Sequence, residues 1–176
     1  MPNVEEKTIT VDDIERTYVI HTPMGADNTT PVLIGLHGGE SNGREWWNRH
    51  WERHADSGIT IICPTAECAG HDTHWRAEGD GSPNDFGDQR FLDTLLSMYA
   101  MCPAYVCGFS SGGKMTHHMY AHSAQGVLGF AVAGHGPNRA MDFSAADVTP
   151  IRIACGTLDS NYAAPDGDTL NFEDTV

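Results

Sequence analysis

The sequence predicts an α/β protein of three layers, in which helices cover both faces of a mostly parallel β-sheet. Two observations lead to this fold class. Short runs that are apolar on both faces recur along the chain, as is typical of strands buried between helices. Segments with helical periodicity alternate with these runs. At 176 residues and 40% hydrophobic content, the chain is long enough for one core, so we expect residues 1–176 to form a single domain.

The expected strands are short apolar runs, several of them ended by a glycine or a proline: 17–21, 31–36, 59–63, 104–107, 127–133 and 151–155. Three amphipathic segments are expected as helices: 44–56, 85–99 and 112–122. Gly58 is expected to end the first of them. The polar, glycine-rich stretch 67–84 is expected to be a long loop. In sheets of this kind, chemistry gathers at the carboxyl ends of the strands, so the residues that follow each strand are the ones to inspect.

Composition excludes several classes of function. The 24 acidic and 10 basic side chains leave a formal charge of −14, which repels nucleic acids and anionic membranes. No apolar run approaches the ~20 residues that span a bilayer. The N-terminal residues do not form a basic segment followed by an apolar one, so no signal peptide is expected. Three of the five cysteines lie in strand-like runs and are expected to be reduced core residues of a cytoplasmic protein.

The first candidate for chemistry follows the run 104–107. Residues Gly108–Gly112 match G-x-S-x-G between an expected strand and an expected helix. Such a turn lifts a serine above the sheet, which makes Ser110 the candidate nucleophile. It also presents the amide of Ser111 at a helix N-terminus, where it can bind a developing oxyanion. The alternative is an ordinary strand-to-helix turn that happens to carry a serine.

Two further signals occur in the order that a serine hydrolase requires. The strand 31–36 runs into His37, Gly38 and Gly39, and glycines there let backbone N–H groups face a substrate. His37 itself is expected to be structural rather than catalytic. Asp159 follows the strand 151–155, where a triad needs its carboxylate. A plain turn residue is the alternative for Asp159.

Taken together, these stretches resemble the α/β-hydrolase superfamily, and within it the esterases related to polyhydroxybutyrate depolymerases and feruloyl esterases. The resemblance implies that Ser110 is the nucleophile, Asp159 the acid, and Ser111 with Gly38 and Gly39 the source of oxyanion donors. Cys68 and Trp75 also resemble family positions near the substrate. Trp75 and His37 are the candidates for substrate contacts, and no cofactor is expected. The substrate would be a short-chain, aryl or hydroxyalkanoate ester, as a small molecule or an oligomer.

One element of that pattern is missing. The triad order in this fold is serine, acid, histidine, yet the last of the ten histidines is His135, which precedes Asp159. We expect the sequence to be cut short at its C-terminus, without the final strand and helix, and to expose apolar surface on that side. His135 is the best internal substitute; His117, His118 and His122 are expected to be packing or surface residues of the helix after Ser110. The alternative function is a catalytically silent hydrolase-fold protein that binds a ligand or partner.

A metal site is the remaining rival. The spacing C-x₄-C-x₂-H-x₂-H, formed by Cys63, Cys68, His71 and His74, offers ligand types that zinc accepts. The second pair is tighter than usual, and Cys63 falls within an expected buried strand. We therefore expect no metal, and interpret this stretch as a loop beside the active site.

Overall fold

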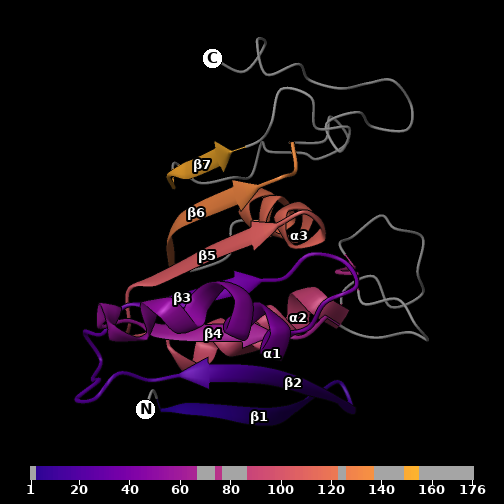
Figure 1. Ribbon diagram of the computed structural model, residues 1–176. Coiled ribbons are helices and arrows are strands. Elements are labelled where there is room, and N and C mark those ends of the chain that lie inside the picture. The colour runs from indigo at the N-terminus through magenta and orange to yellow at the C-terminus, as the bar shows by residue number, and fades with distance from the viewer. Residues whose placement is uncertain (1–2, 67–73, 77–86, 123–125, 137–148, 155–176) are drawn as a thin grey trace, which may run out of the picture.

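The computed structural model describes residues 3–66, 74–76, 87–122, 126–136 and 149–154. Seven strands form one sheet in the order β1-β2-β4-β3-β5-β6-β7 (Figure 1). Neighbouring strands from β4 to β7 in that order are parallel to one another. Strand β2 is antiparallel to both of its neighbours, β1 and β4. The predicted mostly parallel α/β fold is therefore confirmed. The strands are β1 (Val4–Val11), β2 (Ile14–His21), β3 (Val32–Leu36), β4 (Thr60–Pro64), β5 (Ala104–Phe109), β6 (Val127–Ala133) and β7 (Ile151–Ala154).

The N-terminal hairpin is an element that the sequence analysis missed in part. Strand β1 pairs with β2 along its whole length, and the turn between them places Asp12 and Asp13 at φ 51° and 62°. Two successive residues with positive φ make the tight hairpin turn that matches strand twist, and aspartate tolerates that conformation. Most side chains of β1 are exposed, so this strand lacks the apolar run by which the other strands were predicted.

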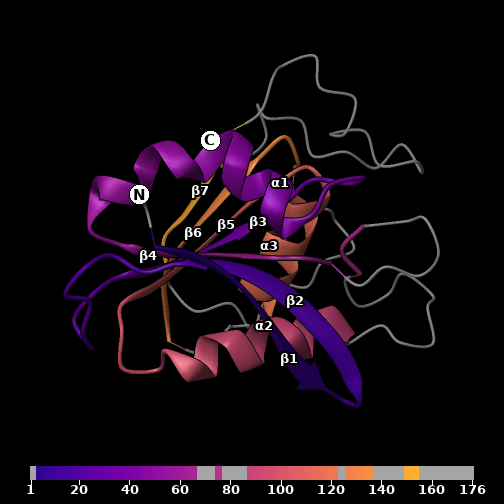
Figure 2. The same cartoon turned by 60° about the horizontal axis from the view of Figure 1, so that its bottom comes forward.

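Helices cover the sheet on both faces, as predicted. Figure 2 shows α2 (Gly87–Met98) and α3 (Ser111–Ala121) on one side, and α1 (Gly43–Trp46) with the turns that follow it on the other. The expected helix 44–56 is in fact α1 followed by a π-helical stretch, η1 (Trp47–Trp51), and a 3₁₀ stretch, η2 (Glu52–Ser57). Gly58, at φ 75°, ends it as predicted.

The π-helical stretch has a packing cause. The indole nitrogens of Trp46 and Trp51 both lie over Gly35 of β3, where an added Cβ would sit 3.3 Å from the first and 2.9 Å from the second. Hydrogen bonding from i to i+5 brings residues five apart onto one face, which an α-helix does not do. The glycine in β3 leaves the room that these two large rings occupy.

The larger part of the core lies between the sheet and the α2–α3 layer; it includes Ile34, Leu36, Phe91, Leu92, Leu95, Met115 and Met119. A smaller cluster under α1 and η1 consists of Val19, Trp47, Ile61 and Cys63. Cys63, Cys102 and Cys107 are free thiols. Burial raises the pKa of Cys63 well above its ordinary value and that of Cys107 to about 12. Of the three cysteines expected in the core, Cys63 is buried, Cys107 is half-buried and Cys155 lies outside the described residues.

Apolar side chains are exposed on the sheet face opposite α2 and α3. Tyr105 on β5 is 39% exposed and Leu128 on β6 is 53% exposed. They border a groove of about 610 Å³ that also contacts Leu33, Cys107 and Arg152 and contains none of the predicted site residues. In the part of the chain that the structure describes, no helix is both long and apolar enough to cross a membrane.

Candidate active site

Ser110 occupies the turn between β5 and α3 with a strained backbone. Its φ of 53° and ψ of −117° lie in a region that residues with a side chain rarely adopt. The turn is held on both sides: the Ser110 N–H donates to the Ala133 carbonyl at 2.9 Å, and the Ser110 carbonyl accepts from the Lys114 N–H at 3.0 Å. A sharp, strained turn between a strand and a helix, held in place by its surroundings, is the geometry that a nucleophile elbow has.

The two glycines of G-x-S-x-G are required by close backbone contacts. A Cβ on Gly108 would lie 2.1 Å from the carbonyl oxygen of Gly112. A Cβ on Gly112 would in turn lie 2.4 Å from the Leu36 oxygen and 2.6 Å from the His37 oxygen. Any larger residue at either position would push the helix away from the sheet, and Ser110 with it.

The loop after β3 lies directly against this elbow. A Cβ on Gly38 would be 3.6 Å from the Cβ of Ser110 and 3.3 Å from the ring of Phe109. Ser111 is the first residue of α3, where backbone N–H groups have no partner within the helix and the helix dipole favours negative charge. The structure therefore brings together Ser110, Ser111 and the Gly38–Gly39 loop, as the sequence predicts. Their catalytic roles stay a prediction.

His37 is fully buried and holds this loop through both ring nitrogens. Its Nδ1 bonds to the carbonyl oxygen of Gly38 at 2.7 Å, and its Nε2 accepts from the Ala66 N–H at 3.1 Å. These partners require the neutral ring with hydrogen on Nδ1. Burial lowers the pKa of His37, in agreement with that form. This environment favours the structural role for His37, and its contact with substrate stays a prediction.

The peptide between Gly38 and Gly39 is planar and trans, so its C=O and its N–H point in opposite directions. Because His37 holds the Gly38 carbonyl, it also directs the Gly39 N–H away from the His37 ring. His37 thus sets the direction of a donor that the sequence assigns to the oxyanion hole.

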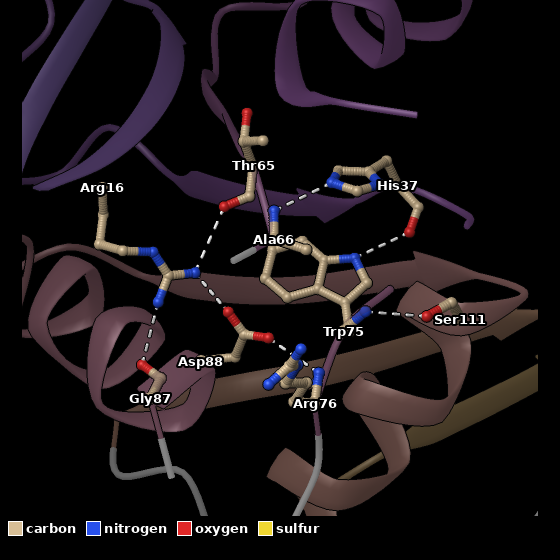
Figure 3. Close-up of polar contacts among 9 residues, drawn as sticks. All are labelled: Arg16, His37, Thr65, Ala66, Trp75, Arg76, Gly87, Asp88 and Ser111. Carbon is tan, nitrogen blue, oxygen red and sulfur yellow. Dashed lines mark hydrogen bonds and ion pairs between the residues drawn. The ribbon is translucent and has the colours of Figure 1, made fainter. Parts of the chain in front are cut away.

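Trp75 is the anchor of a short segment that packs on the same loop. Its side chain is 2% exposed; the indole N–H donates to the His37 carbonyl at 2.8 Å and the backbone N–H donates to Ser111 Oγ at 3.0 Å (Figure 3). The neighbouring His74 is exposed, and its ring lies so close to Gly39 that a Cβ there would sit 2.2 Å from Nε2. The predicted substrate contact of Trp75 stays a prediction. His74 packs on the Gly38–Gly39 loop, in a stretch that the sequence predicts to lie beside the active site.

The sequence analysis also missed a buried ion pair behind this segment, between Arg16 on β2 and Asp88 on α2. The signal that could have indicated it is the alternation of Arg16 with Ile14 and Tyr18, which places the arginine on the apolar face of the strand. A charge buried there requires a partner.

Some of the predicted residues are not described by the structure. Asp159, Cys68 and His71 lie outside the described residues. Within the described ranges, no group of three or more histidine, cysteine or acidic side chains could hold a metal ion. Cys63 is buried in β4.

The histidines of α3 pack as predicted for helix residues. His117 and His118 are buried, whereas His122 is exposed. His117 donates from Nε2 to the His135 carbonyl at 3.3 Å, and the two rings are 5.8 Å apart. His135 therefore packs against α3 through His117, and its role as a substitute base stays a prediction.

The fold is shared with solved hydrolase structures. A carboxyl esterase from Bacillus coagulans, in complex with glycerol, superposes with a TM-score of 0.56 at 17% identity over 76% of this chain. A thermostable esterase gives 0.61 at 17% identity over 86%. A mutant of the feruloyl esterase module from Clostridium thermocellum, complexed with sinapinate, gives 0.55 at 13% identity over 77%.

The chain has the α/β-hydrolase fold. It covers 44%, 46% and 54% of those three proteins, so it spans about half of their length. No protein-family model and no curated protein matches the sequence. At these identities the likeness concerns the fold, and the activity must be argued from the site.

Proposed function

We propose that this α/β-hydrolase chain carries the nucleophile and the oxyanion donors of a serine carboxylic-ester hydrolase. The observation that carries the proposal is the backbone of Ser110, strained at φ 53° between β5 and α3, with the Gly38 loop against it. A plain turn has no reason to retain such strain, whereas a nucleophile elbow needs it to expose the hydroxyl.

In the proposed reaction, Ser110 Oγ attacks the carbonyl carbon of the ester while an imidazole takes the hydroxyl proton. The N–H groups of Ser111 and Gly39 bind the oxyanion of the tetrahedral intermediate. The imidazole then gives the proton to the leaving alcohol, and an acyl group remains on Ser110. Water attacks that acyl-enzyme in a second cycle and releases the acid.

The imidazole is the open part of this proposal. Asp159 would orient it, and no histidine follows Asp159 in the sequence. Without an imidazole, only the oxyanion hole and substrate binding would act, and the rate enhancement over the uncatalysed reaction would be roughly 10³–10⁴. His135 is the substitute to test.

The substrate class rests on the sequence resemblance to polyhydroxybutyrate depolymerases and feruloyl esterases. Short-chain, aryl or hydroxyalkanoate esters are therefore the candidates. An aromatic side chain beside the nucleophile supports an aryl or other apolar group: Phe109 is 47% exposed, and Trp46 stacks on it with ring centroids 6.2 Å apart.

A silent ligand- or partner-binding protein on the same fold is the second candidate. One observation favours it, namely that the only histidines of the chain precede Asp159. The strained Ser110 argues against it, because binding alone does not call for an exposed nucleophile.

Labelling with a fluorophosphonate, followed by peptide mass spectrometry, tests the choice. The esterase proposal expects modification of Ser110 and none in Ser110→Ala, while Ser97→Ala, an exposed serine of α2, labels like the unaltered chain. Hydrolysis of p-nitrophenyl acetate, compared between the unaltered chain and His135→Gln, reports whether His135 serves as the base. A chain whose Ser110 stays unmodified under conditions that label a known serine esterase would support the silent binder.

A further inference from the structure

The buried ion pair between Arg16 and Asp88 is connected to more than its two partners. The two side chains are only 3% and 0% exposed. Arg16 also donates to the Gly87 carbonyl at 3.2 Å and to the Thr65 carbonyl at 3.4 Å, and its guanidinium lies 4.3 Å from the ring centroid of Phe91. The pair thus joins β2, the end of β4 and the start of α2 (Figure 3).

The second carboxylate oxygen of Asp88 serves a different segment. It accepts the backbone N–H of Arg76 at 2.8 Å. Residue 76 ends the described segment 74–76, whose Trp75 donates to the His37 carbonyl and to Ser111 Oγ. His74, at the other end of that segment, packs on Gly39. A chain of contacts therefore runs from Arg16 through Asp88 to both sides of the proposed oxyanion site.

Stability alone does not account for such a pair. Removing two charges from water costs several kcal/mol per ion, and apolar pairs of similar volume are often as stable or more so. What an apolar pair cannot provide is a fixed acceptor for the Arg76 N–H. The geometry of the 74–76 segment thus depends on a polar acceptor at residue 88, which in this chain is an Asp88 carboxylate paired with Arg16.

We propose that Arg16 and Asp88 are positioning residues for the oxyanion site: Asp88, oriented by Arg16, holds residues 74–76 against His37, Gly39 and Ser111. The inference rests on the proposed function. Oxyanion donors act because they are already in place when charge develops, so the loop that carries them must not move. Here the restraint comes from β2 and α2, outside the motifs that supply the donors.

Two double variants separate positioning from packing. Arg16→Met with Asp88→Leu removes both charges and the acceptor, whereas Arg16→Met with Asp88→Asn removes both charges but keeps an amide oxygen for the Arg76 N–H. A matched control alters the exposed ion pair between Arg90 and Asp12, which joins the same hairpin to α2 without reaching residue 76, as Arg90→Met with Asp12→Asn.

The rate of Ser110 labelling is measured per folded molecule, with folding followed by urea unfolding. We expect the leucine variant to label about ten- to a hundredfold more slowly, because small displacements of catalytic groups have effects of this size. The asparagine variant should lose less of its rate, because residue 88 keeps an acceptor for the Arg76 N–H although Arg16 no longer orients it. The exposed control keeps its rate. A folded leucine variant that labels at the unaltered rate would overturn the proposal.

A second readout does not depend on catalysis. Hydrogen exchange of the Trp75 indole N–H and of the Gly39 amide is expected to accelerate about tenfold or more in the leucine variant, and by a smaller factor in the asparagine variant. Unchanged exchange in the leucine variant overturns the positioning role. If the unaltered chain does not label at all, the proposed function fails while exchange still decides the positioning role.

Should the leucine variant not fold, Trp75→Phe keeps a ring but removes the donor to the His37 carbonyl. A Ser110 labelling rate within about threefold of the unaltered chain in Trp75→Phe would then contradict the proposed path, since loss of one positioning contact is expected to cost about tenfold.

Discussion

The α-carbon of Gly112 faces the carbonyl oxygen of Leu36, so closely that a Cβ on residue 112 would lie 2.4 Å from that oxygen. Leu36 is the last residue of β3, and Gly112 is the second residue of α3. The helix that begins after the candidate nucleophile thus rests on the strand whose end carries the candidate oxyanion loop. This contact couples the two motifs and has a direct consequence for substitutions.

We expect Gly112→Ala to lower the free energy of unfolding by about 3 kcal/mol, because both clashing groups are backbone and cannot rotate away. Gly58→Ala provides the comparison. Gly58 has φ 75° but open space around it, so alanine there costs only about 1 kcal/mol of backbone strain. Urea unfolding of both variants checks the order, and equal losses would contradict the packing argument.

Replacing Ser110 tests its backbone strain. Both Ser110→Ala and Ser110→Gly remove the hydroxyl, but only glycine adopts φ 53° and ψ −117° without cost. We expect the glycine variant to be more stable than the alanine variant by about 1 kcal/mol, measured by thermal or urea unfolding. Elsewhere in a protein the entropy of glycine would reverse that order, so an alanine variant of higher stability would show that the turn is not strained.

Gly39→Ala separates reactivity from stability. The added methyl group meets the ring of His74 at 2.2 Å, and that ring is the movable end of an exposed side chain. We expect the free energy of unfolding to change by less than about 0.5 kcal/mol. If Gly39 supplies an oxyanion donor, the displaced contact lowers the Ser110 labelling rate by about tenfold. If Gly39→Ala labels at the rate of the unaltered chain, the Gly39 N–H is not a closely positioned oxyanion donor.

Acid pH should destabilise the fold through His117. Burial, with His135 nearby, lowers the pKa of His117 to about 4 from an ordinary value of 6.5. Between these pH values the unfolded chain binds a proton that the folded chain does not, so stability falls as pH drops from 6.5 toward 4. Below about pH 4 this contribution stays constant. The loss amounts to at most about 3 kcal/mol.

The measurement is urea unfolding across pH 4 to 7. His117→Gln removes the titrating group and should flatten the slope, whereas His122→Gln, exposed at the end of α3, should leave it unchanged. The buried His37, whose pKa is also lowered, adds to the remaining slope with the same sign. A slope that His117→Gln leaves intact would assign the acid sensitivity to other groups.

The exposed sheet face should bind apolar dyes in the folded state. Leu128 is 53% exposed beside the groove of about 610 Å³, so Leu128→Gln should weaken binding of anilinonaphthalene sulfonate and change stability by less than about 0.5 kcal/mol. Leu92→Gln, inside the core, should instead unfold the chain. Dye binding unaffected by Leu128→Gln would place the dye elsewhere.

Much of the fold could be predicted because the parallel strands are apolar on both faces and need no knowledge of their neighbours. The same holds for Ser110, Ser111 and Gly38, since each directly follows such a strand. Strand β1 could not be found in this way, because its side chains are mostly exposed and it is held by pairing with β2. The π-helical stretch after Trp46 likewise depends on the room above Gly35.

The sequence by itself determined the α/β class, the order along the chain of every strand except β1, and the position of the candidate nucleophile. All of these follow from local patterns of apolar residues and glycines. Only the tertiary structure decided why those glycines are needed, since Gly112 and Leu36 are 76 residues apart and meet through the sheet. It also decided that Trp75 anchors the 74–76 segment on the loop after β3, and that the Arg16–Asp88 pair binds the same segment through the Arg76 N–H. Hydrogen bonds and ion pairs between distant segments depend on how those segments pack, and no local periodicity records that.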